Sequence, residues 1–102
     1  MDRPAPAPVG FLTPHARLVL ALARGPARTV PQLAADCRTS ERTVRRIIAD
    51  LVGGGFLTRE GAGQRVRHGL RHDAATWHPF EGRLSVRTLL LLAAVDREEE
   101  NA

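Results

Sequence analysis

The sequence predicts a small α+β domain that is mostly helical. Three segments carry apolar residues at helical spacing, and a pair of short alternating segments around a glycine-rich loop is typical of a β-hairpin. The length of 102 residues supports one domain with one core. With 43% hydrophobic and 25% charged residues, the composition is that of a globular chain and excludes an intrinsically disordered one.

The first helix is expected to run from Pro14 to Arg24. Thr13 is a good N-cap, and proline suits the first helical position. Gly25 follows a cation in the last turn and is expected to end the helix in a left-handed conformation. Proline and alanine alternate over residues 4–8, which predicts a disordered tail over residues 1–10.

The next segments predict a short strand, two helices and a tight turn between the helices. Residues 28–30 suit at most one edge strand, and residues 31–37 suit a short second helix. A two-residue turn at Arg38-Thr39 follows, and Ser40 is the expected N-cap of a third helix over residues 41–52. The apolar stripe of this third helix consists of Val44, Ile47, Ile48 and Leu51.

A β-hairpin is expected after the third helix. Residues 56–60 and 65–70 are the predicted strands, and the glycine-rich residues 61–64 form the loop between them. An irregular connection over residues 71–79 then leads to a last helix near residues 85–96.

The order of these elements is that of a winged helix-turn-helix domain. It has a three-helix core, a β-hairpin wing and a C-terminal helix, and its third helix corresponds to the one that reads DNA. We expect this domain over residues 11–96 and a solvated acidic tail over residues 97–102.

Several motifs carry a family resemblance. They are VPQLAADCRTSERTVRRIIADL at residues 30–51, GFLTR at 55–59, LTPHAR at 12–17 and HPFE at 78–81. Together they resemble the short bacterial winged helix-turn-helix transcription regulators related to the MarR family. The resemblance covers residues 12–95 and implies a DNA-binding regulator that is usually a dimer.

The distribution of charge independently predicts a polyanion as partner. All 15 basic residues are arginine, the formal net charge is +4, and the pI is near 11.2. Residues 38–71 hold eight arginines against three acidic residues, whereas the rest of the chain has a net charge of −1. This concentration over the third helix and the hairpin is expected of a double-stranded DNA binder.

The third helix presents arginines opposite its apolar stripe. Arg42 and Arg46 project away from the core at 100° per residue, and an arginine can bridge guanine O6 and N7 with two hydrogen bonds. The first turn of the helix suits a phosphate contact, and the arginines of the wing over residues 59–67 suit contacts to the DNA backbone or the minor groove. An ordinary solvated helix face is the alternative for such arginines. The candidate DNA-binding residues are Ser40, Arg42, Thr43, Arg45, Arg46, Arg59, Arg65 and Arg67.

The first and last helices are apolar on all sides, which predicts a homodimer. A chain of this length has little material to cover two such helices, and an isologous contact between the terminal helices would cover them. The alternative is a monomer in which the segment with Trp77 and Phe80 folds over these faces. The expected dimer-interface residues are Leu18, Leu20, Leu89, Leu90 and Leu92.

Three groups of residues have a structural and a chemical interpretation. Cys37 is expected in the core, although some MarR relatives use a single reactive cysteine as a redox sensor. Trp77 and Phe80 are expected to pin the post-hairpin segment onto the core, with a ligand-binding aromatic pair as the alternative. The third group consists of His68, His72, Asp73 and His78. We expect His68 to line a face of the hairpin and His78 to stabilise a corner, and a metal site formed by these residues is the weaker interpretation.

No catalytic triad, carboxylate pair or phosphate-binding loop is present, so we expect neither an enzyme nor a cofactor. The single cysteine excludes an intramolecular disulfide. The longest apolar run has 7 residues and no signal peptide is apparent, which predicts a cytoplasmic, nucleoid-associated protein without a membrane partner. The expected function is a sequence-specific transcription regulator, more specifically a repressor, with a winged-helix protein–protein adaptor as the alternative. The sequence identifies no small-molecule effector.

Overall fold

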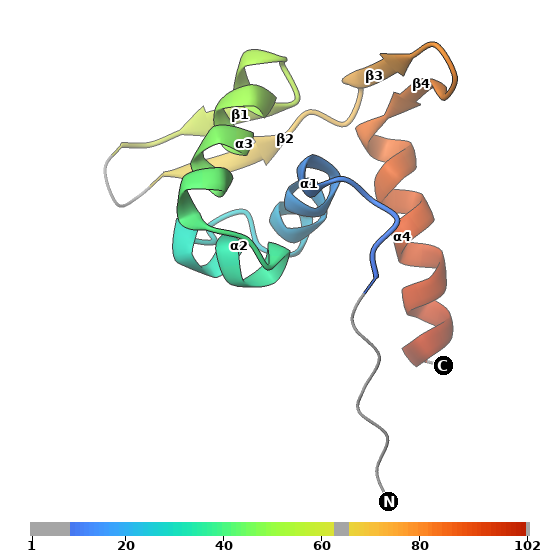
Figure 1. Ribbon diagram of the computed structural model, residues 1–102, viewed down its shortest axis with the longest axis horizontal. Helices are drawn as coiled ribbons and strands as arrows, with labels where there is room; N and C mark the ends of the chain where they lie inside the picture. The colour runs from blue at the N-terminus through green and yellow to red at the C-terminus, as the bar shows by residue number, and fades with distance from the viewer. Residues whose placement is uncertain (1–8, 63–65, 102) are drawn as a thin grey trace, which may run out of the picture.

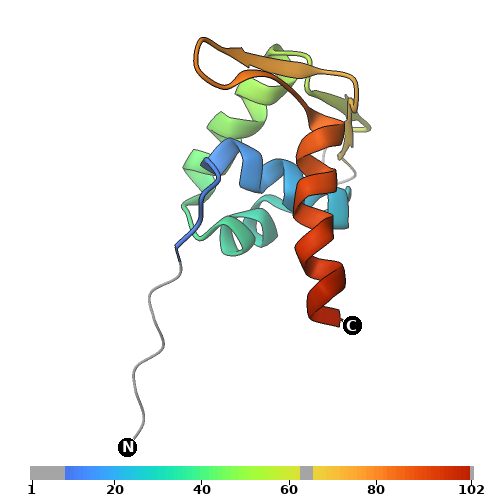
Figure 2. The same ribbon diagram turned by 90° about the vertical axis from the view of Figure 1, so that its right-hand side faces the viewer.

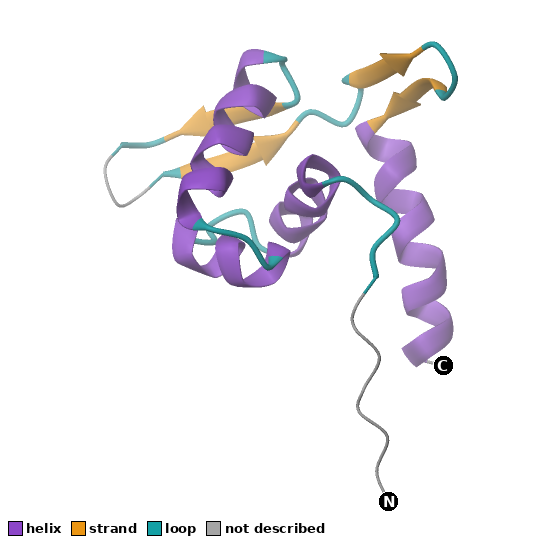
Figure 3. Cartoon of the chain, in the orientation of Figure 1, coloured by secondary structure: helices purple, strands orange, loops and turns teal. Residues whose placement is uncertain are grey.

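The computed structural model describes residues 9–62 and 66–101 and confirms the α+β fold class. Within these residues, three helices are followed by two antiparallel hairpins and a fourth helix, an order compatible with a winged helix-turn-helix domain (Figures 1 and 3). The elements are α1 (Pro14–Arg24), α2 (Val30–Cys37), α3 (Glu41–Gly53), β1 (Leu57–Glu60), β2 (Arg67–Leu70), β3 (Ala75–His78), β4 (Gly82–Ser85) and α4 (Val86–Asn101). Residues 1–8 of the expected tail over residues 1–10 lie outside the described residues.

Side-chain caps place the starts of the first helices. The Thr13 hydroxyl accepts a hydrogen bond from the Ala16 N–H, and α1 begins at Pro14, as predicted. Its end differs from the prediction, because Gly25 is extended (φ −158°) rather than left-handed. The Gly25 N–H still satisfies the Ala21 carbonyl, and the Gly25 carbonyl accepts from the Arg28 N–H, so the chain turns without a left-handed residue.

The predicted edge strand at residues 28–30 is wrong. Thr29 is instead the N-cap of α2, in a capping box in which Thr29 and Gln32 satisfy each other's backbone N–H groups. This cap commits Val30 to the first turn of the helix. A backbone hydrogen bond from the His68 N–H to the Pro26 carbonyl, at 3.3 Å, joins the connection between α1 and α2 to β2.

The turn between α2 and α3 is as short as predicted. Arg38 has the left-handed φ of 54°, and its N–H and that of Thr39 satisfy carbonyls of the last turn of α2. Ser40 then caps α3, which begins at Glu41. The predicted stripe of α3 is confirmed, with Val44, Ile47 and Leu51 buried and Ile48 half-buried.

The wing is the hairpin of β1 and β2. Its register pairs Leu57 with Leu70, next to the core, and Glu60 with Arg67, near the tip. Both strands are shorter than predicted, and the loop between them includes residues 63–65, which are not described.

A second hairpin replaces the irregular connection expected over residues 71–79. β3 and β4 pair antiparallel, and Trp77 lies opposite Arg83. At the turn, the His78 Nδ1 accepts hydrogen bonds from the backbone N–H groups of Phe80 (3.1 Å) and Glu81 (3.3 Å), and Gly82 takes a φ of 76°. The prediction that His78 stabilises a corner is confirmed. The hairpin itself was not predicted, because strands of four residues show too little alternation of apolar and polar residues to be recognised in the sequence.

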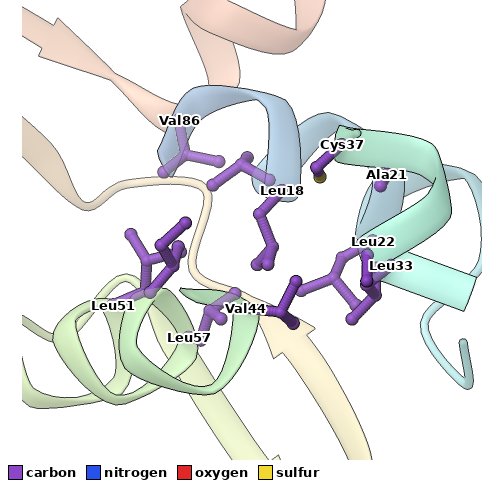
Figure 4. Close-up of a cluster of buried hydrophobic side chains, with 12 residues drawn as sticks. Leu18, Ala21, Leu22, Leu33, Cys37, Val44, Leu51, Leu57 and Val86 are labelled. Carbon is purple, nitrogen blue, oxygen red and sulfur yellow. The ribbon is translucent and has the colours of Figure 1, made fainter. Parts of the chain in front are cut away.

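One hydrophobic core joins the four helices and the hairpin of β1 and β2 (Figure 4). α1 lies at its centre and packs against α2, α3, α4 and the wing strand β2. The core residues are Leu18, Val19, Ala21, Leu22, Leu33, Ala34, Cys37, Val44, Ile47, Leu51, Leu57 and Val86. The core therefore holds α3 and the wing in fixed relative positions.

α4 packs against α1 and extends beyond the three-helix core (Figure 2). It continues to Asn101, beyond the expected end at Asp96, so the acidic residues after Asp96 extend the helix rather than forming a separate tail. In the described part of the chain, no helix has the length and apolar character needed to cross a membrane.

Candidate nucleic-acid interface

Helix α3 has one buried and one exposed face. Val44 and Ile47 have no solvent exposure and anchor it to α1 and α2. On the opposite side Arg42 and Arg46 are exposed, and neither forms an ion pair with another described residue. Two unpaired guanidinium groups one turn apart on a helix anchored from behind can reach into a groove without disturbing the core.

The other candidate residues of α3 have local partners. Arg45 is exposed and lies 3.4 Å from the Glu41 carboxylate, a solvent-exposed pair that holds it weakly. The Ser40 hydroxyl accepts from the Thr43 N–H (3.1 Å) and lies 2.9 Å from the Thr43 hydroxyl. Ser40 and Thr43 thus build the helix start, where free N–H groups favour a phosphate.

The wing carries arginines on both of its faces. Arg59 is exposed and lies opposite His68, whereas Arg67 is exposed and lies opposite Glu60 on the other face. Arg65 lies outside the described residues. β1 packs against α3, so the wing lies beside this helix (Figure 1).

Arg38 was missed among the candidate residues. It is exposed in the turn directly before α3, at the left-handed position. Its place between two predicted helices was the signal that could have found it.

His68 is the titratable group that the wing perturbs. It is half-buried, and burial together with the Arg59 guanidinium lowers its pKa from the ordinary value of 6.5. His68 therefore favours its neutral form. Its predicted position on a face of the wing is confirmed.

Cys37 belongs to the core, as predicted. Its side chain is 3% exposed and lies among the core residues of Figure 4. Burial and the Asp36 carboxylate raise the pKa of its thiol, and Arg17 lowers it to a lesser extent. A buried thiol with a raised pKa is a poor nucleophile.

The histidines and Asp73 do not assemble into a cluster. Among residues 9–62 and 66–101, no group of three histidine, cysteine, aspartate or glutamate side chains is placed to hold a metal ion. Asp73 instead binds Arg87 of α4 at 2.7 Å, and this hydrogen bond and the positive charge lower the pKa of the carboxyl.

The expectation that Trp77 and Phe80 pin the post-wing segment onto the core is wrong. Trp77 is 71% exposed and Phe80 is 90% exposed. Val86, Leu89 and Leu90 of α4 fasten this part of the chain to the core instead. The two aromatic side chains stand on a hairpin that projects away from the three-helix core (Figures 1 and 2).

The expected dimer-interface leucines differ in accessibility. Leu18 has no exposed surface, so its assignment to a dimer interface is wrong: it fills the centre of its own core. Leu20, Leu89 and Leu90 are half-buried. On α4, Leu92 is 64% exposed, and Leu91, which was not among the expected interface residues, is 60% exposed.

The fold and the charged surface define a winged helix-turn-helix domain with an arginine-rich face. The chain matches no protein-family model, and no curated protein matches it significantly.

Proposed function

We propose that this protein is a sequence-specific double-stranded DNA-binding transcription regulator. α3 enters the major groove, and the wing contacts the DNA backbone or the minor groove. The observation that carries the proposal is the pair of exposed, unpaired guanidinium groups of Arg42 and Arg46 on a helix whose opposite face is fixed in the core.

The electrostatics of the same surface support this function. The net charge of residues 38–71 is +5, and these residues comprise the turn before α3, α3 itself and the wing. Such a surface attracts a polyanion and raises its rate of encounter. The resemblance to MarR-related regulators supports the same function, and a repressor that occludes promoter DNA on the nucleoid is its simplest form.

Selection of bound duplexes from a random pool, followed by a salt titration, tests the proposal. We expect a consensus sequence to emerge, and we expect the logarithm of its affinity to fall steeply and linearly with the logarithm of salt concentration. A protein that enriches no sequence and whose affinity for duplex DNA does not depend on salt would not be a DNA-binding regulator.

We further propose that the protein binds DNA as a homodimer. The support is on α4, where Leu91 and Leu92 are largely exposed on a helix that extends past the core. A two-fold dimer would present two α3 helices to half-sites about one helical turn apart, which predicts a palindromic consensus.

A protein–protein adaptor is the second candidate function. The exposed Trp77 and Phe80 favour it, because aromatic side chains of this kind are enriched at protein interfaces. The two functions differ in their response to salt, since an apolar contact lacks the counterion release that accompanies binding to phosphates.

A further inference from the structure

The exposed apolar side chains of this protein are unevenly distributed. Eight large apolar side chains are exposed among the described residues. One of them, Val52 at 36%, belongs to the part of the chain that comprises α1–α3 and the wing. The β3–β4 hairpin and α4 contribute four, which are Trp77, Phe80, Leu91 and Leu92. The remaining three, Val9, Phe11 and Leu12, precede α1.

The hairpin is a separate projection rather than part of the core. Its principal packing contact is between β4 and α4, and Figures 1 and 2 show it standing off the three-helix core, on the side away from the wing. Ser85 caps the first turn of α4 by accepting from the Thr88 N–H at 3.1 Å, so the hairpin and α4 are directly joined. The hairpin and α4 thus form one structural unit.

The charge of the hairpin and of the residues that flank it differs from that of the DNA-binding surface. Residues 72–87 carry two arginines and two acidic residues, a balanced set. Asp73 and Arg87 form an ion pair at 2.7 Å. A neutral surface with two exposed aromatic rings suits a protein partner rather than a nucleic acid.

We propose that the β3–β4 hairpin is an arm that packs against a second copy of this chain, with Trp77 and Phe80 as its anchors. This inference rests on the dimer proposed above and identifies its main contact. Each aromatic side chain can bury about 150–250 Å², and with the α4 leucines one chain offers on the order of 500 Å² of apolar surface. Two copies then offer about 1,000 Å², which is the area a specific interface requires.

The arm supplies interface area that the leucines of α4 alone do not provide. Two α4 helices that meet through Leu91 and Leu92 alone would bury only a narrow strip of surface. An arm at the start of each α4, reaching over the partner, widens the contact on both sides of the two-fold axis. Each aromatic anchor occurs twice in such an isologous interface.

Trp77 makes the inference directly measurable, because it is the single tryptophan of the chain. The experiment records its fluorescence emission and its quenching by acrylamide from submicromolar to high micromolar protein, with light scattering on the same samples and without DNA. We expect the mass to rise from 11.1 kDa toward twice that value. Over the same range the emission should shift to shorter wavelength and the quenching should fall.

Variants separate the arm from the rest of the interface. Trp77→Ser combined with Phe80→Ser should weaken self-association at least about tenfold, because both side chains are anchors. Phe11→Ser is the matched control, since Phe11 is fully exposed and lies outside the arm, and it should leave association unchanged. All three positions are exposed, and circular dichroism and thermal unfolding establish that each variant is folded.

Each outcome has a definite meaning. A mass that doubles while Trp77 emission stays constant and the double variant still associates would overturn the arm and leave the dimer in place. A mass that stays at 11.1 kDa at all concentrations would overturn both the dimer and the arm. Because salt-dependent DNA binding is measured separately, neither result removes the proposed DNA-binding function.

Discussion

Arg59 of β1 and His68 of β2 lie directly opposite each other on one face of the wing. Cross-strand partners in an antiparallel pair are close neighbours, so the guanidinium opposes protonation of the imidazole. Burial acts in the same direction and is the larger cause of the lowered pKa of His68.

The first prediction concerns stability and pH. Because the pKa of His68 is lower in the folded state than its ordinary 6.5, the unfolded chain binds more protons below that pH. The contribution of neutral His68 is therefore present above pH 6.5 and is lost as pH falls toward the folded-state pKa. Urea unfolding of the wild type and of His68→Gln across this range should show a smaller acid destabilisation in the variant.

NMR titration of the His68 ring provides the companion measurement. Arg59→Ala removes the positive charge opposite His68 and should raise the pKa of the imidazole without restoring it fully, since burial remains. An unchanged pKa in Arg59→Ala would mean that the cross-strand charge has no effect.

The second prediction concerns the exposed face of α3. Arg42→Ala or Arg46→Ala should lose about 1–3 kcal/mol of binding to the selected sequence, with a relaxed preference at one base position, because each removes a bidentate contact. Arg24→Ala is the control, an exposed arginine at the end of α1 outside both the proposed DNA-binding surface and the β3–β4 hairpin. Quantitative binding to the consensus and to single-base variants measures both effects. Unchanged affinity and preference in both α3 variants would place this helix outside the groove.

The third prediction concerns the wing. Arg59→Ala together with Arg67→Ala should weaken binding to all duplexes alike and reduce the log–log salt slope by about 2, if each arginine meets one phosphate. Glu60→Gln, which removes an acid beside Arg67, should have the opposite effect on affinity. A salt slope that stays the same in the double variant would argue against contact between the wing and DNA.

The fourth prediction separates core leucines from surface leucines. Leu18→Ala should cost about 2–5 kcal/mol of unfolding free energy, because Leu18 is wholly buried and the substitution leaves a cavity. Leu92→Ala, at 64% exposure, should change it by roughly 0.5 kcal/mol or less in dilute monomer. Chemical denaturation measures both, and similar costs for the two variants would contradict the assignment of Leu18 to the core.

The fifth prediction concerns Cys37. Its burial and raised pKa should keep it unreactive toward an aromatic disulfide reagent at neutral pH, with full reaction in guanidinium chloride. Stopped-flow absorbance under native and denaturing conditions makes the comparison. Rapid reaction of the native protein would favour the redox-sensor hypothesis instead.

The amino-acid sequence by itself determined the parts of this protein whose causes are local. Thr13 and Ser40 fix the starts of α1 and α3, since a side-chain cap acts on N–H groups two or three residues away. The stripe of Val44, Ile47 and Leu51 fixes the buried face of α3 and therefore the exposed position of its arginines. The order of the elements then predicted the winged arrangement.

Only the tertiary structure decided which apolar side chains are covered. α1 and α4 each carry leucines in more than one direction around the helix, and periodicity cannot distinguish the face that a neighbour will occupy. Packing of α1 at the centre of the core buries Leu18, whereas α4 extends past the core and leaves Leu91 and Leu92 exposed. Trp77 and Phe80 are exposed for the same reason: burial depends on which segments meet in space, and pairing of β3 with β4 holds them away from the core.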